Sequence, residues 1–246
     1  MPSPSFSISP IVEADIPGIC ALSGAAFEKD RHTLLKAAHP TRPCDHAGGM
    51  GGAVKYWLDI PNEKIMHMKA VDDETSEVIA FGVFGLRLSP PQPQPSSVKK
   101  PSNSVGQDYV KTDSPDLDGI ARLEEHTSSH FADFQKRMMP DGVRCMYIMS
   151  MSVHPEHQGR GVGSALMKLG TDRADEEGVF CWVHSSKDGA EFYRKCGFET
   201  DDTLEIDLDY WADQMDPKLV PPAGDEKWGT YIFRYMIRQP KPVKGT

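Results

Sequence analysis

Apolar and polar positions change their period along the chain, and each change predicts a different element. Phe6 and Ile8 alternate with serines, which predicts a short, half-buried strand that ends near Val12. A helical period follows over residues 16–27, with Asp15 as the expected N-cap. The chain is therefore predicted to begin with a strand and a helix.

The next part of the chain is first irregular and then regular. In residues 28–62, prolines and the glycine-rich run 48–52 interrupt any period, so we expect loops around one or two short helices. Apolar β-formers then occupy residues 65–71 and 78–88, on either side of the polar turn DDETSE. This pattern predicts a long antiparallel hairpin.

A Pro/Ser-rich stretch at residues 89–104 follows the hairpin. Its composition cannot supply a hydrophobic core, so we expect an exposed excursion here. Helical spacing returns over residues 117–139 and stops at the sequence PDG. We therefore predict a single domain over residues 1–246 with an insertion at about 89–142.

The second half of the chain alternates strands and helices. An apolar strand at residues 146–153 leads through a glycine-rich loop into a helix at residues 163–177. The further elements are a strand at 179–184, a helix at 189–196, and strands at 203–208 and 229–238 joined by a loop rich in Asp and Pro.

The composition fits one globular core and argues against nucleic acid as a partner. The chain has 246 residues, of which 39% are hydrophobic and 26% charged, and this suffices for one well-buried core. Its formal net charge of −9 does not suit a protein that binds phosphate backbones. The same charge is compatible with a cationic substrate.

Several common signals are absent from the sequence. The five cysteines contain no C-x-x-C pair, which argues against a disulfide framework or a zinc ribbon. His126 and His130 lack the glutamate of zincin motifs, and the cluster of His39, Cys44 and His46 lacks a fourth ligand at the usual spacing. We predict no metal site. The N-terminal residues do not resemble a signal peptide, and no run of about 18 apolar residues occurs, so we expect a cytoplasmic protein without a membrane partner.

The sharpest chemical signal is the run VHPEHQGRGVGS at residues 153–164, between the apolar strand and the following helix. Glycines let successive backbone N–H groups turn toward one point, and a helix N-terminus adds partial positive charge. The run therefore predicts a pyrophosphate cradle, to which Arg160 can add an ion pair. It matches neither the G-x-x-x-x-G-K-[ST] loop nor the G-x-G-x-x-G loop. The alternative is a helix that merely begins with glycines.

A second motif, GAEFYRKCGFE, lies downstream at residues 189–199. The Q-x-x-G-x-G of residues 158–163 and the F-Y-x-x-x-G-F of residues 192–198, in this order and at this spacing, resemble the two core motifs of the GNAT superfamily of N-acetyltransferases. The resemblance extends to the first strand and helix and to the hairpin. It implies an α/β GNAT fold, with a mixed, mostly antiparallel, V-shaped central sheet and helices on both faces.

The resemblance also implies which residues bind acetyl-CoA, the acyl-donor cosubstrate. In the family, exposed backbone groups of the strand before the loop pair with the pantetheine arm, and the loop amides hold the pyrophosphate. The corresponding residues here are Met151, Ser152 and Val153 on the strand and Gln158, Gly159, Arg160, Gly161, Val162, Gly163 and Ser164 in the loop. Where many relatives carry an asparagine after the next strand, this chain has the sequence SSKD at residues 185–188.

The catalytic residue implied by the resemblance is Tyr193, whose counterpart in the family protonates the departing thiolate. A free amine with a pKa near ~10.4 is mostly protonated at neutral pH, so a base or a water chain must remove its proton. The candidates for that step are Ser150 and Ser152, which share a strand face and can order a water, His184, and Glu124 or Glu125. An exposed or structural role is the alternative for each.

These features predict an acetyl-CoA-dependent N-acetyltransferase that modifies a primary amine by direct transfer in a ternary complex. The insertion and the long final loop would enclose a small acceptor, which favours a small-molecule amine. One alternative is a protein lysine or N-terminal acetyltransferase. The other is a non-catalytic acyl-CoA-binding module, and the presence of Tyr193 argues against it.

Overall fold

One open sheet organises the part of the chain that the structure describes. The computed structural model describes residues 5–88 and 118–242, so the Pro/Ser-rich stretch at 89–104 lies outside the described residues. The strand order in the sheet is β1-β2-β3-β4-β5-β7-β6. The strands are β1 (Phe6–Pro10), β2 (Ile65–Asp72), β3 (Val78–Arg87), β4 (Cys145–Val153), β5 (Phe180–Ser185), β6 (Glu199–Asp207) and β7 (Thr230–Arg238).

Antiparallel pairing joins every neighbouring pair of these strands except β4 and β5, which run parallel. The predicted hairpin is the antiparallel pair of β2 and β3, in which Ile65 lies opposite Gly85. The structure therefore confirms a mixed, mostly antiparallel sheet.

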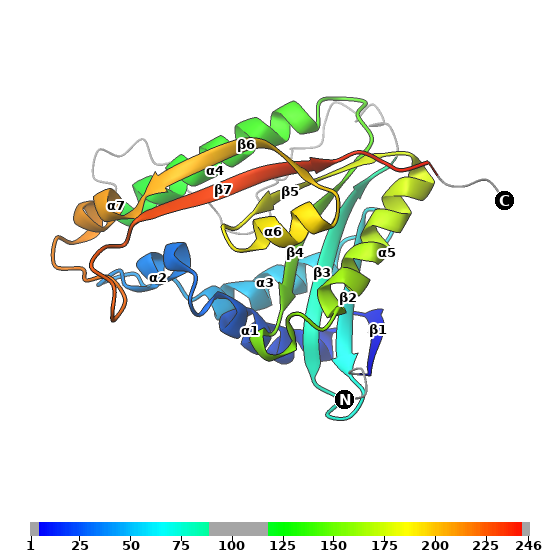
Figure 1. Cartoon of the computed structure of the whole chain (residues 1–246), viewed down its shortest axis with the longest axis horizontal. Coiled ribbons are helices and arrows are strands. Elements are labelled where there is room, and N and C mark those ends of the chain that lie inside the picture. Colours follow the sequence, from blue (N-terminus) through cyan, green and yellow to red (C-terminus); the bar gives the residue numbers. More distant parts are fainter. Residues whose placement is uncertain (1–4, 89–117, 243–246) are drawn as a thin grey trace.

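The sheet forks between β4 and β5. These strands pair over residues 145–148 and 180–183 alone. Beyond this short ladder, β4 continues to Val153 against β3, and β5 continues to Ser185 against β7. Figure 1 shows the two groups of strands, β1 to β4 and β5 to β7, diverging from their common end, which confirms the predicted V shape.

Helices cover both faces of the sheet, as predicted. They are α1 (Ile16–Phe27), α2 (Arg31–Ala37), α3 (His46–Leu58), α4 (Gly119–Met138), α5 (Val162–Glu177), α6 (Gly189–Lys195) and α7 (Leu208–Met215). Strand alternation on β5 separates the faces: Cys181 and Val183 pack with side chains of α5 and α6, whereas Trp182 packs with Phe134 of α4. Within the described ranges, no helix combines the length and the apolar character needed to cross a bilayer.

The glycine-rich run 48–52 is helical, contrary to the expectation that it would interrupt helical structure. It lies inside α3, which α1 contacts closely. A Cβ on Gly51 would lie 3.0 Å from the Cys20 sulfur, and one on Gly24 would lie 3.4 Å from the Ala47 Cβ. The missing side chains allow the two helices to approach, so tertiary packing offsets the low helix propensity of glycine.

Asp15 occupies the N-cap position of α1, as predicted, but its side chain does not cap the helix. A short 3-10 turn (Glu13–Asp15) precedes the helix, and the Asp15 side chain makes no capping hydrogen bond to it. One carboxylate oxygen of Asp15 accepts a 2.8 Å hydrogen bond from the Val12 N–H, and the other lies 2.5 Å from the Lys69 Nζ. The carboxylate therefore joins the start of α1 to β2.

Helices α4 and α7, which pack near strands β5 to β7, differ in how well the sequence predicted them. The structure confirms the helix expected at residues 117–139 as α4, and its Leu123 and Phe134 are buried in the core formed with β5, β6 and β7. This part of the predicted insertion therefore belongs to the core. In the loop expected between β6 and β7, the structure instead contains α7, whose N-terminus is capped by Asp207 through the N–H groups of Asp209 and Tyr210.

Candidate active site

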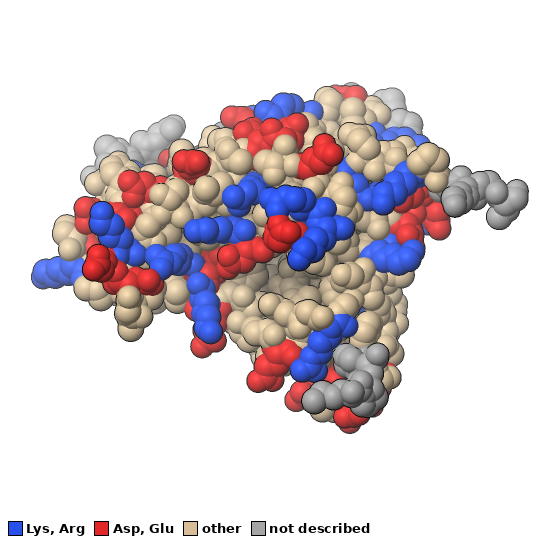
Figure 2. All heavy atoms as spheres, in the orientation of Figure 1, with Lys and Arg blue, Asp and Glu red and all other residues tan. Residues whose placement is uncertain are grey.

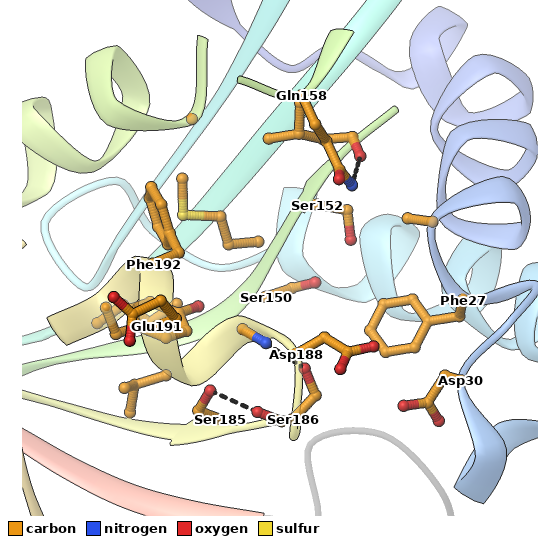
Figure 3. A pocket seen from close by; sticks show the side chains of 18 of the residues that line it. Phe27, Asp30, Ser150, Ser152, Gln158, Ser185, Ser186, Asp188, Glu191 and Phe192 are labelled. Atoms are coloured by element: carbon orange, nitrogen blue, oxygen red, sulfur yellow. Dashed lines mark hydrogen bonds between the residues drawn. The ribbon is translucent and has the colours of Figure 1, made fainter. Parts of the chain in front are cut away.

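A cavity of about 770 Å³ opens where β4 and β5 part. Its walls come from β4, from the glycine loop, from the end of β5 and the start of α6, and from the adjoining ends of α1 and α3. Figure 2 shows this hollow on the molecular surface, with Lys and Arg side chains along the rim formed by α6. Figure 3 shows Ser150 and Ser152 of β4 facing the same space as Phe27, Asp30 and Asp188.

The glycine loop presents a row of backbone N–H groups at the start of α5. Gly159 and Gly161 have φ angles of 74° and 84°, a left-handed conformation that favours glycine. No side chain caps the helix, and the first N–H that reaches a loop carbonyl is that of Ala165, which donates to Gly161 at 2.9 Å. Among the described residues, the N–H groups of residues 159–164 have no acceptor. This arrangement suits an anion such as a pyrophosphate.

Most of the residues predicted to bind the cosubstrate line the cavity. They are Met151, Ser152, Val153, Gln158, Gly159, Gly161, Gly163 and Ser164. Val162 is buried in the core behind the loop, so its backbone N–H is the group it can offer. Arg160 is exposed and does not line the cavity, and its charge acts on Asp72. The proposed ion pair of Arg160 stays a prediction.

Beyond the fork, one edge of β4 pairs with no strand among the residues that the structure describes. The His154 N–H donates to the Ile79 carbonyl at 2.9 Å, so the backbone groups of His154 face β3. Along a strand, the backbone N–H and C=O groups of successive residues face opposite edges. The backbone groups of Ser152 therefore face β3, and those of Met151 and Val153 face the open edge. The Gln158 side chain already donates to the Val153 carbonyl at 3.2 Å. The open edge suits an extended, amide-containing ligand such as a pantetheine arm.

Tyr193 lies in the wall of the cavity on α6. Its ring packs edge-on against Phe192 and Phe198, with centroid separations of 5.4 and 5.6 Å. Burial, with a smaller contribution from nearby Cys196, raises the pKa of Tyr193 well above its usual value. The phenol therefore keeps its proton at neutral pH, as a proton donor must.

Comparison with known proteins finds a family model that matches the central part of the site. Residues 121–200, which contain the β4 strand, the glycine loop and Tyr193, match the family model described as an acetyltransferase (GNAT) domain. This segment is similar to a GNAT acetyltransferase domain. A search among curated proteins gave no significant match.

Solved structures support the GNAT fold of the whole chain. An agmatine N-acetyltransferase mutant in its apo form superposes with a TM-score of 0.56 at 13% identity, over 95% of this chain and 99% of that chain. A protein described as histone acetyltransferase HPA2 and related acetyltransferase, from Corynebacterium glutamicum, gives a TM-score of 0.51 at 17% identity, over 98% of this chain and 99% of that chain. At these identities the likeness shows the fold alone.

The candidates for the base are placed differently from one another. His184 lines the cavity, but it stacks on Tyr235 at 4.7 Å, and burial together with His130 lowers the pKa of His184 to about 4. Glu124 pairs with Lys36 at 3.0 Å and, like Glu125, does not line the cavity. The glutamates therefore lie outside the site.

Ser150 and Ser152 fit the predicted water-ordering role better than the other candidates. Both line the cavity, and Figure 3 shows both hydroxyl groups facing it. The Ser152 hydroxyl is buried and has no hydrogen-bond partner among the described residues. A buried hydroxyl group without a protein partner in a polar cavity is a position where an ordered water is expected.

The segment that replaces the family's asparagine also lies in the wall of the GNAT cavity. The Ser185 hydroxyl donates to the Ser186 carbonyl at 2.9 Å, and the Ser186 hydroxyl accepts from the Gly189 N–H at 3.2 Å. Both serines are therefore used to shape the turn before α6. Asp188 lines the cavity next to them.

Sequence reasoning missed the residues that close the cavity opposite the glycine loop. These are Phe27 at the end of α1, Asp30 before α2, and His46 at the start of α3. The stretch 28–62 has no sustained period, so nothing in the pattern placed it beside β4. The local signal that could have helped is Asp30 three residues before Thr33, because aspartate is a common N-cap; in the structure its side chain accepts a 2.8 Å hydrogen bond from the Thr33 N–H.

The histidines considered as metal ligands make other contacts. His130 lies 3.0 Å from the Tyr235 hydroxyl through Nδ1, and His126 packs against Trp211. The Nδ1 of His39 accepts from the Arg42 N–H at 3.1 Å. In the described part of the chain, no three His, Cys, Asp or Glu side chains are grouped as a metal ion would require.

Proposed function

We propose that this GNAT domain transfers the acetyl group of acetyl-CoA to a primary amine of a small molecule, directly and within a ternary complex. The observation that carries the proposal is the meeting of three features at one cavity. These are the uncapped N–H row of residues 159–164, the open edge of β4, and the protonated phenol of Tyr193. Acetyl-CoA supplies the acyl group as a thioester.

The glycine loop binds the cosubstrate in this proposal. Six consecutive loop amides, from Gly159 to Ser164, point their donors toward a pyrophosphate at the positive end of the α5 dipole. The backbone groups of Met151 and Val153 on the open edge of β4 bind the pantetheine arm. The chain thereby holds the thioester near the fork, where β4 and β5 stop pairing.

The chain's own groups then complete the transfer. Ser150 and Ser152 order a water that removes a proton from the amine. A backbone N–H on the open edge of β4 stabilises the oxyanion that forms when the amine attacks the thioester carbonyl. Tyr193 donates its proton to the sulfur as the carbon–sulfur bond breaks, so that the departing thiolate, whose conjugate acid has a pKa near ~8.5, leaves as a neutral thiol. The proton taken from the amine passes through the ordered water to solvent, and the tyrosinate takes a proton back from solvent.

The size of the cavity favours a small acceptor. Phe27, Asp30, His46 and Met50 line the same cavity of about 770 Å³ as the glycine loop, a volume typical of small-molecule sites. A protein acceptor is the alternative, and a non-catalytic acyl-CoA-binding module is the other. A cytoplasmic location stays a prediction.

The test is release of free thiol from acetyl-CoA across a panel of aliphatic amines, arylamines, polyamines and peptides, with mass spectrometry of the acceptor. We expect thiol release that depends on the amine and a product heavier by one acetyl group. Turnover of peptides alone would favour the protein acetyltransferase. Tight acetyl-CoA binding without turnover of any acceptor would favour the binding module.

A further inference from the structure

His46, the first residue of α3, lines the cavity together with Phe27 of α1. The two rings pack with their centroids 4.4 Å apart, and Figure 3 shows the Phe27 ring directed into the cavity. A titratable side chain therefore borders the space in which the acetyl transfer is proposed. The steps proposed for that transfer do not use this ring.

A hydrogen bond to α1 sets the orientation of the His46 ring. Its Nε2 lies 3.1 Å from the Oγ of Ser23, a fully buried residue that does not line the cavity. The two nitrogens of an imidazole point in different directions, so Nδ1 is the nitrogen left for the cavity. Within the described ranges, Nδ1 has no hydrogen-bond partner. An imidazole held at one nitrogen and free at the other has the arrangement of a catalytic base.

Burial and three charged side chains act on the His46 ring. Burial is the largest cause and lowers the pKa of His46, while Asp30 raises it, Lys36 lowers it and Asp45 raises it, with a net shift downward. The ring is therefore neutral at neutral pH and has an electron pair that can accept a proton. Once the ring is protonated, the negative charges of Asp30 and Asp45 stabilise the imidazolium.

The other histidines that line the cavity are less suited to accept a proton. Burial, with a smaller contribution from His130, lowers the pKa of His184 to about 4, so its imidazole is a weaker base. His157 ends the 3-10 turn (Pro155–His157) that leads into the glycine loop, at the end of the cavity proposed for the cosubstrate. In the part of the chain that the structure describes, neither ring is held by a side-chain hydrogen bond as that of His46 is.

An alkylammonium ion must lose two protons before its nitrogen becomes an amide nitrogen. The first must leave before the attack, because the ammonium nitrogen has no free electron pair, and the ordered water of Ser150 and Ser152 carries away the second. We propose that Nδ1 of His46 takes the first proton as general base and that Ser23 positions the ring. The ammonium N–H bond breaks, its electron pair stays on the nitrogen for the attack on the thioester carbonyl, and the imidazolium later releases the proton to solvent. This role rests on the proposed acetyl transfer.

The test compares two acceptors of similar size, ethylamine and trifluoroethylamine, on the full chain with acetyl-CoA. Ethylamine is mostly protonated at neutral pH, as alkylamines with a pKa near ~10.4 are. The fluorine atoms withdraw electrons and leave trifluoroethylamine mostly as the free amine, which has no first proton to lose. Thiol release measures kcat/KM for both amines. We expect His46→Gln to lower kcat/KM for ethylamine about a hundredfold at neutral pH and to leave that for trifluoroethylamine nearly unchanged.

The pH dependence adds a readout that a merely structural role would not change. As the pH approaches the pKa of ethylamine, solvent itself supplies the free amine, so the deficit of His46→Gln should shrink between about pH 7 and about pH 9.5. Ser23→Ala removes the orienting hydrogen bond and keeps the base, so it should lower the ethylamine rate less than His46→Gln does. His126→Gln, at an exposed position of α4, is the matched control and should keep both wild-type rates.

The outcomes separate the base from the transferase function. A wild-type ethylamine rate in His46→Gln would uphold the transferase and overturn the base. Equal losses for the two amines, or a deficit that stays constant with pH, would also overturn it, because His46 would then act through structure alone. If wild-type protein released no thiol with these amines or with any other amine of the panel, the transferase function itself would fall, and the base with it.

Discussion

Ile148 of β4 lies beside Val183 of β5, and this is the last pair that the two strands share. Immediately after it, β4 carries a bulge at Met149, since the register with β3 moves from Phe84 opposite Ile148 to Val83 opposite Ser150. A bulge bends its strand and disrupts the local ladder, and β4 and β5 stop pairing at this residue. The cavity, the open edge of β4 and the separation of strands β1 to β4 from strands β5 to β7 all begin at this pair.

The left-handed conformation of Gly161 is expected to control CoA affinity. A Cβ there would meet no atom within 4 Å, so Gly161→Ala acts through its φ of 84° alone. Such strain costs about 1–2 kcal/mol, and relief of it would turn the loop amides away from their common point. We expect the Kd for CoA, measured by calorimetry, to rise about fivefold to thirtyfold. An unchanged Kd in a folded variant would show that the loop amides do not hold the pyrophosphate.

Replacement by alanine should change the stability of the protein differently at two neighbouring glycines of α3. Gly52 is exposed, and a Cβ there meets nothing within 4 Å, so Gly52→Ala should stabilise the protein by about 0.5–1 kcal/mol through helix propensity. At Gly51 the same Cβ would lie 3.0 Å from the Cys20 sulfur, so Gly51→Ala should gain less or destabilise. Thermal unfolding of both variants measures the difference. A larger gain at position 51 would mean that α1 and α3 are not closely packed there.

The buried histidines should make the fold sensitive to acid. Burial, with His130 nearby, lowers the pKa of His184 from 6.5 to about 4, and burial together with Lys36 and His184 lowers that of His32 from 6.5 to about 3. The unfolded chain then binds more protons below pH 6.5, so stability falls as the pH drops from about 6.5 toward 4. For His184 the loss amounts to roughly 3 kcal/mol.

The matched variants isolate this dependence. His184→Phe keeps a ring in the stack with Tyr235 and removes the titrating group, so its unfolding free energy should fall less steeply between about pH 6.5 and about pH 4. His126→Gln, at an exposed position, should keep the wild-type slope. Parallel slopes for wild type and His184→Phe would contradict the neutral, buried state of this imidazole.

Replacement of the Pro/Ser-rich stretch at residues 89–104 should change stability little. Its composition cannot supply core, so exchange for a short Gly/Ser linker is expected to leave the melting temperature within a few degrees of wild type. The exchange leaves α4 intact, because Leu123 and Phe134 are part of the core. A fall of many degrees would mean that the stretch packs against the domain.

Regular periods and special backbone conformations made most of the fold predictable. The hairpin of β2 and β3 was visible because apolar β-formers flank a polar turn, and the glycine loop because left-handed positions require glycine. The helix α3 could not be predicted from the sequence, because its glycines make sense only when a second helix, α1, packs against them.

The part of the cavity where we propose that the acceptor binds could not be found from the sequence, because it depends on distant residues. Asp30 and Tyr231, joined by a hydrogen bond of 2.5 Å, are 201 positions apart. A single sequence gives no information about contacts of this length. The cosubstrate end, by contrast, is built from a continuous segment whose local pattern already specifies its shape.

The role of Tyr193 tests the account most directly, because the proposed chemistry passes through its hydroxyl group. The measurement is the single-turnover rate of acetyl transfer by Tyr193→Phe, with Tyr210→Phe, an exposed tyrosine on α7, as the matched control. We predict a fall of roughly tenfold to a thousandfold for Tyr193→Phe, with CoA affinity unchanged and no loss in the control. Since the phenol of Tyr193 stays protonated at neutral pH, the deficit should be constant from about pH 7 to about pH 9. A wild-type rate in Tyr193→Phe would contradict the account.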